Sequence, residues 1–149
     1  METPDPDYTI TSNFEIKVVR PKGWKDYSAY NFEAPKPDPD SQFFANINVT
    51  QANLPLGLSY DAHVKAEYTL YKDMLESFEL IHHRKGQVHK SSATELMFDW
   101  MMEEHIMRQR VVFLKSGIRK LLTFSAVAAK ADYPAQEPFF NKVLASLKT

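Results

Sequence analysis

The chain has 149 residues, of which 44% are apolar and 25% are charged, and its formal net charge is −1. These values are ordinary for a soluble globular domain, and the charge argues against a nucleic-acid partner held by phosphate contacts. Because the chain has no cysteine, disulfides, thiolate metal sites and cysteine nucleophiles are excluded.

The length predicts a single domain over residues 1–149, with residues 1–7 flexible. The acidic start has no basic segment followed by an apolar core, so it does not resemble a signal peptide. No apolar run approaches the length of a membrane span. We therefore expect a cytoplasmic protein that does not insert directly into a membrane.

Alternating apolar residues predict strands in the first third of the chain. Residues 8–19 form a strand or a short hairpin, with Asn13 at the turn. A further strand falls within residues 24–32, and another within residues 43–49. Residues 34–41 are rich in proline and aspartate, which is typical of an extended, exposed loop.

Two helices are predicted from apolar residues that recur at helical spacing. The first begins after Ser59, its expected N-cap, with Asp61 in the first turn. Its apolar stripe consists of Tyr60, Val64, Tyr68, Tyr71 and Leu75. The second runs from Asp132 to Leu147, with Pro134 or Pro138 in its first turn. Its apolar stripe consists of Phe140, Val143, Leu144 and Leu147.

Between these helices the pattern returns to strands. One strand starts near residues 77–81, and Gly86 is expected at the turn that follows. Three longer strands cover residues 93–104, 105–115 and 118–128, the last two joined through a turn at residues 115–117. Consecutive hairpins predict an α+β fold in which helices flank an antiparallel β-sheet.

The strand near residues 94–107 carries an unusual second face. One parity holds Thr94, Leu96, Phe98, Trp100 and Met102, as a half-buried strand should. The other parity holds Met97, Asp99 and Met101. Methionine suits surfaces that accept several apolar shapes. Two interpretations remain: this face binds an apolar partner, or helices cover both faces.

Asparagines at strand positions suggest a second candidate surface. Asn31, Asn46, Asn48 and Thr50 supply hydrogen-bonding groups where asparagine is disfavoured. Such a face could bind polar atoms of a partner, or it could simply face water.

The residues give little support for catalysis, so we predict that the protein is not an enzyme and needs no cofactor. His82 and His83 are adjacent on a strand and point to opposite faces, so they cannot easily share a metal ion. Asp99 is better explained as the partner of a neighbouring arginine, Arg108 or Arg110. His105 is better explained as part of a polar turn. Catalysis by Asp99 or His105 stays a remote alternative.

Short motifs in chain order resemble those of the DcrB-like proteins. They are Pro21-Lys22-Gly23-Trp24-Lys25-Asp26-Tyr27-Ser28 with Phe32, Leu54-Pro55-Leu56-Gly57-Leu58-Ser59, Leu75-Glu76-Ser77-Phe78-Glu79-Leu80, Gln109-Arg110 with Phe113 and Gly117, and Gln136-Glu137-Pro138-Phe139-Phe140 with Leu144-Ala145-Ser146-Leu147. The resemblance implies a PsbP-like fold, in which helices sandwich an antiparallel sheet. Its secreted members have a signal and a lipobox cysteine, which this chain lacks.

Cytoplasmic proteins of similar length in this group include the Eag chaperones of bacterial type VI secretion. The resemblance therefore implies a homodimeric chaperone or adaptor that binds the N-terminal hydrophobic transmembrane segments of a secreted effector and helps to load it onto a spike protein. The client-binding residues it suggests, on one sheet face, are Ala29, Asn31, Asn46, Asn48, Met97 and Met101. The alternative is a PsbP-like scaffold that docks a soluble partner through loops such as residues 34–41.

One motif departs from the Eag-like pattern. Those proteins tend to have S-x-N-x-F in the third strand, whereas this chain has Tyr30 at the asparagine position and Asn31 one place on. Since a shift of one residue moves a side chain to the other face of a sheet, the face that Asn31 occupies must be read from the structure.

Overall fold

A computed structural model describes residues 8–13, 16–23, 29–35 and 44–147. Residues 1–7, expected to be flexible, and most of the expected loop at residues 34–41 lie outside these ranges.

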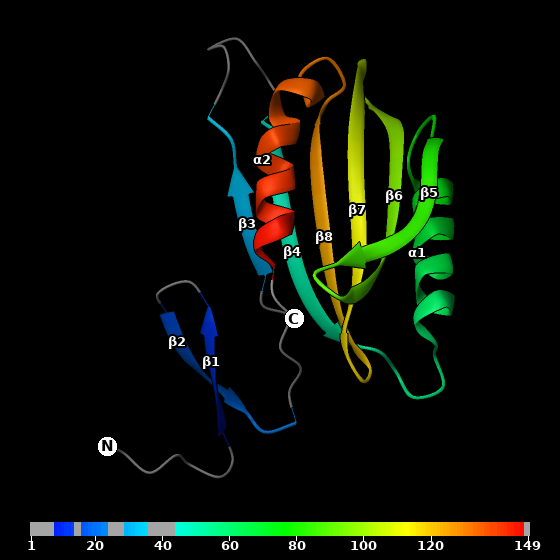
Figure 1. The fold of residues 1–149 in the computed structure, drawn as a ribbon. Coiled ribbons are helices and arrows are strands. Elements are labelled where there is room, and N and C mark those ends of the chain that lie inside the picture. The colour runs from blue at the N-terminus through cyan, green and yellow to red at the C-terminus, as the bar shows by residue number, and fades with distance from the viewer. Residues whose placement is uncertain (1–7, 14–15, 24–28, 36–43, 148–149) are drawn as a thin grey trace.

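The described residues form eight strands and two helices (Figure 1). They are β1 (Tyr8–Asn13), β2 (Ile16–Pro21), β3 (Ala29–Glu33), β4 (Asn46–Asn53), α1 (Tyr60–Met74), β5 (Glu79–Val88), β6 (Ser91–Met102), β7 (His105–Gly117), β8 (Lys120–Ala129) and α2 (Tyr133–Ser146). A two-stranded sheet pairs β1 with β2, as the expected N-terminal hairpin requires. The main sheet has the order β3-β4-β8-β7-β6-β5, and every pairing is antiparallel. The predicted α+β fold is confirmed.

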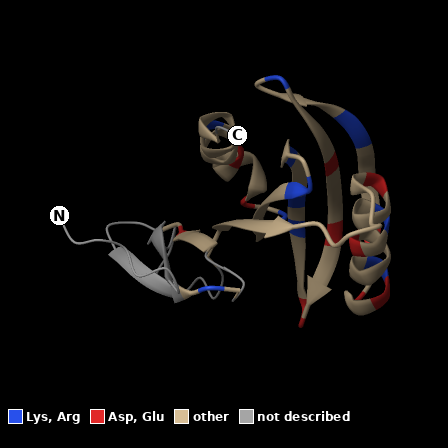
Figure 2. Ribbon diagram, turned by 90° about the horizontal axis from the view of Figure 1, so that it is seen from below, with Lys and Arg blue, Asp and Glu red and all other residues tan. Residues whose placement is uncertain are grey.

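The two helices pack on opposite sides of the main sheet (Figure 2). We call one side the α1 face, where Leu96, Phe98, Val111 and Phe113 lie in one core cluster with Val64 of α1. We call the other side the α2 face. There the core cluster combines Ala93, Val112, Leu114, Phe124 and Ala126 with Tyr133, Phe140 and Leu144 of α2. The middle strands are therefore buried on both faces.

The helix signals read from the sequence are confirmed in detail. The Ser59 side chain accepts a hydrogen bond from the Ala62 amide at 3.1 Å, which satisfies one of the free donors at the start of α1. The predicted apolar stripe of α1 faces the sheet. In α2, Pro134 lies in the first turn and Pro138 lies inside the helix. Neither helix is long and apolar enough to cross a membrane.

Two predicted turns are displaced. Gly86 lies inside β5, paired with Ala93, and the turn falls at His89 and Lys90, whose φ angles are 52° and 119°. The β7–β8 turn falls at residues 118–119, because Gly117 already pairs with Lys120. Strand β5 runs past Gly86 and β7 ends at Gly117, so both turns lie beyond the glycine. Non-glycine residues adopt the positive φ of each turn.

Strand β5 bends across the sheet. In Figure 1 it passes in front of β6 and β7, on the side that carries α2. A register irregularity between Leu80 and His82 marks a bulge in this strand, and bulges increase local bending and twist. The β5–β6 hairpin reaches the end of α2, where His89 Nε2 lies 2.5 Å from the Ala145 carbonyl oxygen. One margin of the α2 face is therefore closed by the sheet itself.

Replacing Phe98 with alanine tests the core on the α1 face. Phe98 has no exposed surface, and its ring centroid lies 5.0 Å from those of Tyr71 and Phe78. We expect Phe98→Ala to lower the free energy of unfolding by about 3–5 kcal/mol, because it leaves a cavity under α1. Urea denaturation measures this. The control Ile118→Ala changes a side chain that is 93% exposed; an equal loss there would contradict the assignment of Phe98 to the core.

Candidate functional site

The structure divides the six predicted client-binding residues between the two sheet faces. Asn31 pairs with Asn48, and Ala29 pairs with Thr50, which places Ala29, Asn31, Asn46 and Asn48 on the α1 face. Met97 pairs with His82 and Arg110 on the α2 face, and Met101 shares its parity. The expectation that these residues share one face is wrong, because the parity of β6 relative to β4 depends on pairings through two intervening strands.

A line of polar side chains crosses the α1 face. We call it the polar row, and it consists of Asn31, Asn48, Ser125, Gln109 and Trp100, one from each of β3, β4, β8, β7 and β6. The Asn48 amide donates to Asn31 Oδ1. Asn48 is the register partner of Ser125. Gln109 Nε2 donates to Ser125 Oγ at 3.0 Å, and Trp100 Nε1 donates to Gln109 Oε1 at 3.0 Å.

The part of the polar row that lies on β3 and β4 is open. Asn31 and Asn46 are exposed, and Ala29 and Asn48 are half-buried. In Figure 1, α1 lies beside β5 and β6, at the opposite edge of the sheet from β3. Leu121, at the start of β8, packs in the core cluster with Val64 of α1. Within the described chain, no helix covers the α1 face over β3, β4 and the rest of β8. We call this region the open half-face.

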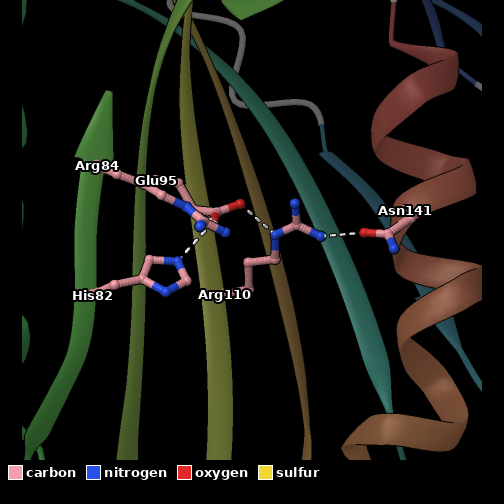
Figure 3. Close-up of polar contacts among 5 residues, drawn as sticks. All are labelled: His82, Arg84, Glu95, Arg110 and Asn141. Carbon is pink, nitrogen blue, oxygen red and sulfur yellow. Dashed lines mark hydrogen bonds and ion pairs between the residues drawn. The ribbon is translucent and has the colours of Figure 1, made fainter. Parts of the chain in front are cut away.

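The diagonally opposite part of the sheet, over β5, β6 and β7 on the α2 face, is occupied by a charged cluster (Figure 3). Glu95 of β6 lies at its centre and is only 9% exposed. Arg110 Nε of β7 donates to Glu95 Oε1 at 2.5 Å, while Arg84 and His82 of β5 contact Oε2 at 3.0 and 2.7 Å. Arg110 also donates to Asn141 of α2. The cluster therefore links three strands to a helix.

Electrostatics keep Glu95 ionised. Burial acts to raise its pKa, but the hydrogen bond and positive charge of Arg110, with hydrogen bonds from His82 and Arg84, outweigh burial and lower the pKa below its ordinary value of 4.5. A carboxylate held this way is a structural ion-pair centre. The buried Tyr133 nearby has a pKa raised to about 12 by desolvation.

Asp99 and the two methionines lie beside this cluster. Arg108 donates to both carboxylate oxygens of Asp99, at 2.9 and 3.1 Å, as the sequence predicted for one of the two neighbouring arginines. Lys130 Nζ lies 3.4 Å from the same carboxylate. Met97 and Met101 are half-buried, and Met97 packs against the core of the α2 face. The Asp99 carboxylate is thus buried in ion pairs with Arg108 and Lys130 and is not exposed to solvent.

The adjacent histidines separate as the strand pleat predicts. His82 contacts Glu95 on the α2 face, whereas the His83 ring stacks on Tyr68 of α1 with centroids 6.5 Å apart. His105 is exposed beside the β6–β7 turn. Among the described residues, no group of three or more histidine and acidic side chains could hold a metal ion.

Sequence reasoning missed several members of both clusters. Gln109 and Arg110 were noticed as a motif, but their partners Ser125, Trp100 and Glu95 were not. The available signal was polar residues at apolar strand positions on consecutive strands. The strand register is needed to show which of these polar residues are neighbours on one face.

Comparison with solved structures places the architecture in the PsbP-like class of folds. The protein PA94 of Pseudomonas aeruginosa, of unknown function, aligns with a TM-score of 0.81 at 20% identity, covering 95% of this chain and 96% of that one. The cyanobacterial PsbP protein CyanoP from Synechocystis sp. PCC 6803 aligns with a TM-score of 0.54 at 13% identity, covering 96% and 92%. LpqN of Mycobacterium tuberculosis, involved in cell envelope biogenesis, aligns with a TM-score of 0.58 at 12% identity, covering 96% and 78%.

The sequence itself gives the narrower assignment. Residues 15–146 match the DcrB family, and the chain belongs to that family. A comparison with curated protein sequences finds no match. The family assignment favours a role in protein interaction or regulation.

Replacing Glu95 tests the charged cluster. We expect Glu95→Gln to lower the free energy of unfolding at pH 7 by about 2 kcal/mol, because Arg110 keeps a poorly exposed guanidinium without a carboxylate partner. Since folding lowers the pKa of Glu95, its contribution is full above the unfolded value near 4.5 and is lost as the pH falls through the lower folded value. Urea denaturation at several pH values should show the difference from wild type shrinking in acid.

The matched control for this prediction is Glu104→Gln, at an exposed position in the β6–β7 turn. It should change stability by no more than about 0.5 kcal/mol. If the loss caused by Glu95→Gln were as small as in the control, or did not vary with pH, the charge of Glu95 would not stabilise the fold.

Proposed function

We propose that this protein is a cytoplasmic, homodimeric chaperone or adaptor that binds the N-terminal hydrophobic helices of a type VI secretion effector on the open half-face and helps to load the effector onto a spike protein. The proposal extends the family assignment to a client class. The observation that carries it is the hydrogen bond between the half-buried Asn48 and the exposed Asn31, on a half-face that no described helix covers.

Transmembrane helices associate through small residues that allow close approach and through polar side chains that hydrogen-bond between helices. The open half-face offers both kinds of residue, in Ala29, Asn31, Asn46, Asn48, Thr50, Thr123 and Ser125. A side-chain amide has two donors and an acceptor with two lone pairs, so Asn31 and Asn48 retain capacity beyond their mutual bond. A helix laid here would find its polar groups matched while its apolar surface is shielded from water.

The assignment of Met97 and Met101 changes under this proposal. They lie on the α2 face among Glu95, Asp99 and their arginines, so a client on the open half-face does not reach them. We therefore propose Ala29, Asn31, Asn46 and Asn48 as the client-binding residues. A client role for the two methionines would need the α2 face.

Placing a charged side chain at one exposed position of the open half-face tests whether the client binds there. We expect Asn31→Arg to reduce client capture at least about tenfold, because an arginine buried against a hydrophobic helix costs about 2.5–3.5 kcal/mol. The fold should be unchanged, since Asn31 is exposed on an edge strand. The measurement is affinity capture from the native host followed by quantitative mass spectrometry, with thermal unfolding as the check on folding.

The matched controls place the same arginine on the α2 face, outside the open half-face. Phe32→Arg changes the residue directly after Asn31 in the same strand, which lies on the α2 face and is 47% exposed. Met101→Arg changes the other candidate surface. Both should capture the client as wild type does. Loss with Met101→Arg alone would move the client to the α2 face. Capture of proteins that lack an N-terminal hydrophobic segment would favour the scaffold that docks a soluble partner.

A further inference from the structure

Two adjoining hollows lie at one end of the main sheet, away from the polar row and the charged cluster. Their volumes are about 710 and 400 Å³, within the usual range of ligand sites. They share four lining residues, Ser59, Tyr60, Ser92 and Lys115. We call them together the end cleft. Its walls are the start of α1 and the β5–β6 and β7–β8 turns, and Figure 1 shows the start of α1 at the same end of the sheet as the β7–β8 turn.

The charges of the end cleft are unbalanced. Lys85, Lys90, Lys115 and Arg119 line it, against the single carboxylate of Asp61. That carboxylate is already paired with Lys85, at 3.4 Å. The Arg119 guanidinium donates to the Leu54 carbonyl at 3.1 and 3.0 Å.

Two cations and one hydroxyl of the cleft remain without partners in the described part of the chain. The side chains of Lys90 and Lys115 form no hydrogen bond or ion pair there. Ser116 also lines the cleft, and its buried Oγ has no hydrogen-bond partner among the described residues. A buried hydroxyl without a partner is costly, and an anionic oxygen is an acceptor that suits the two exposed ammonium groups.

The wall of the cleft is also partly apolar. Leu58 is half-buried and Ile118 is 93% exposed beside the lysines. A free inorganic anion would leave this apolar surface in water. A peptide that carries carboxylates next to an apolar side chain would match both features of the wall.

We propose that the end cleft binds an acidic protein segment, with carboxylates on Lys90 and Lys115 and an apolar side chain against Leu58 and Ile118. This site is separate from the client face, because it shares no residue with the polar row. It gives the protein a second contact, suited to an acidic segment of a partner.

The test uses a fluorescein-labelled peptide of glutamates with one central leucine, measured by fluorescence anisotropy on the full chain. We expect saturable binding that weakens with added salt. Each of Lys90→Glu and Lys115→Glu should weaken binding at least about tenfold, since each removes a charge-assisted hydrogen bond and places a like charge beside the peptide carboxylates. Lys142→Glu makes the same change of net charge on α2, outside the cleft, and should bind as wild type does.

Three outcomes would overturn the proposal. They are the absence of saturable peptide binding, an equal loss with Lys142→Glu, and binding of inorganic pyrophosphate without binding of the peptide, which would assign the cleft to a small phosphate. Asn31→Arg, which removes the proposed client contact, should leave peptide binding unchanged. Failure of one proposal can therefore be distinguished from failure of the other.

Discussion

An α-helix with its side chains is about 10–12 Å wide, and neighbouring strands lie about 4.7–4.9 Å apart, so one helix covers little more than two strands. The main sheet has six strands and one described helix on each face. More than half of each face must therefore be covered in another way or left open. Since α1 packs toward β5–β6 and α2 toward β4–β8, the uncovered halves lie diagonally opposite each other.

The two uncovered halves are treated differently. On the α2 face, β5 bends over the sheet and the carboxylate of Glu95 gathers cations from β5 and β7, with Asn141 of α2 attached through Arg110. Buried charges are tolerated when they are paired and hydrogen-bonded. The charged groups in this half therefore find their partners within the protein itself. On the α1 face the polar row ends in the exposed Asn31 at the β3 edge. That difference makes the open half-face the better candidate for binding another protein.

Strand pairing also explains why Met97 and Met101 lie on a different face of the sheet from Asn31, Asn46 and Asn48. Both sets occupy strand positions where a polar or flexible side chain is unusual, and by sequence alone they look like one surface. The register from β4 through β8 and β7 to β6 places them on opposite sides.

The sequence by itself determined the elements and much of their orientation. Helical spacing identified the buried stripe of α1, a serine cap identified its start, and consecutive hairpin patterns identified the antiparallel sheet. These features depend on neighbours in the chain, so local physics is enough to read them. The pairing of Asp99 with an arginine of the next strand was predictable for the same reason, because β6 and β7 are joined by a tight turn.

The tertiary structure decided which residues meet across the sheet. Glu95 and Asn141 are linked through Arg110, and Asn31 reaches the row that ends at Trp100, through strands that are distant in sequence. A one-residue change of register reverses the face of a whole strand. The glycines did not fix that register, since the turns after β5 and β7 lie beyond Gly86 and Gly117. Which residues share a face is therefore decided by all five strand pairings of the main sheet together.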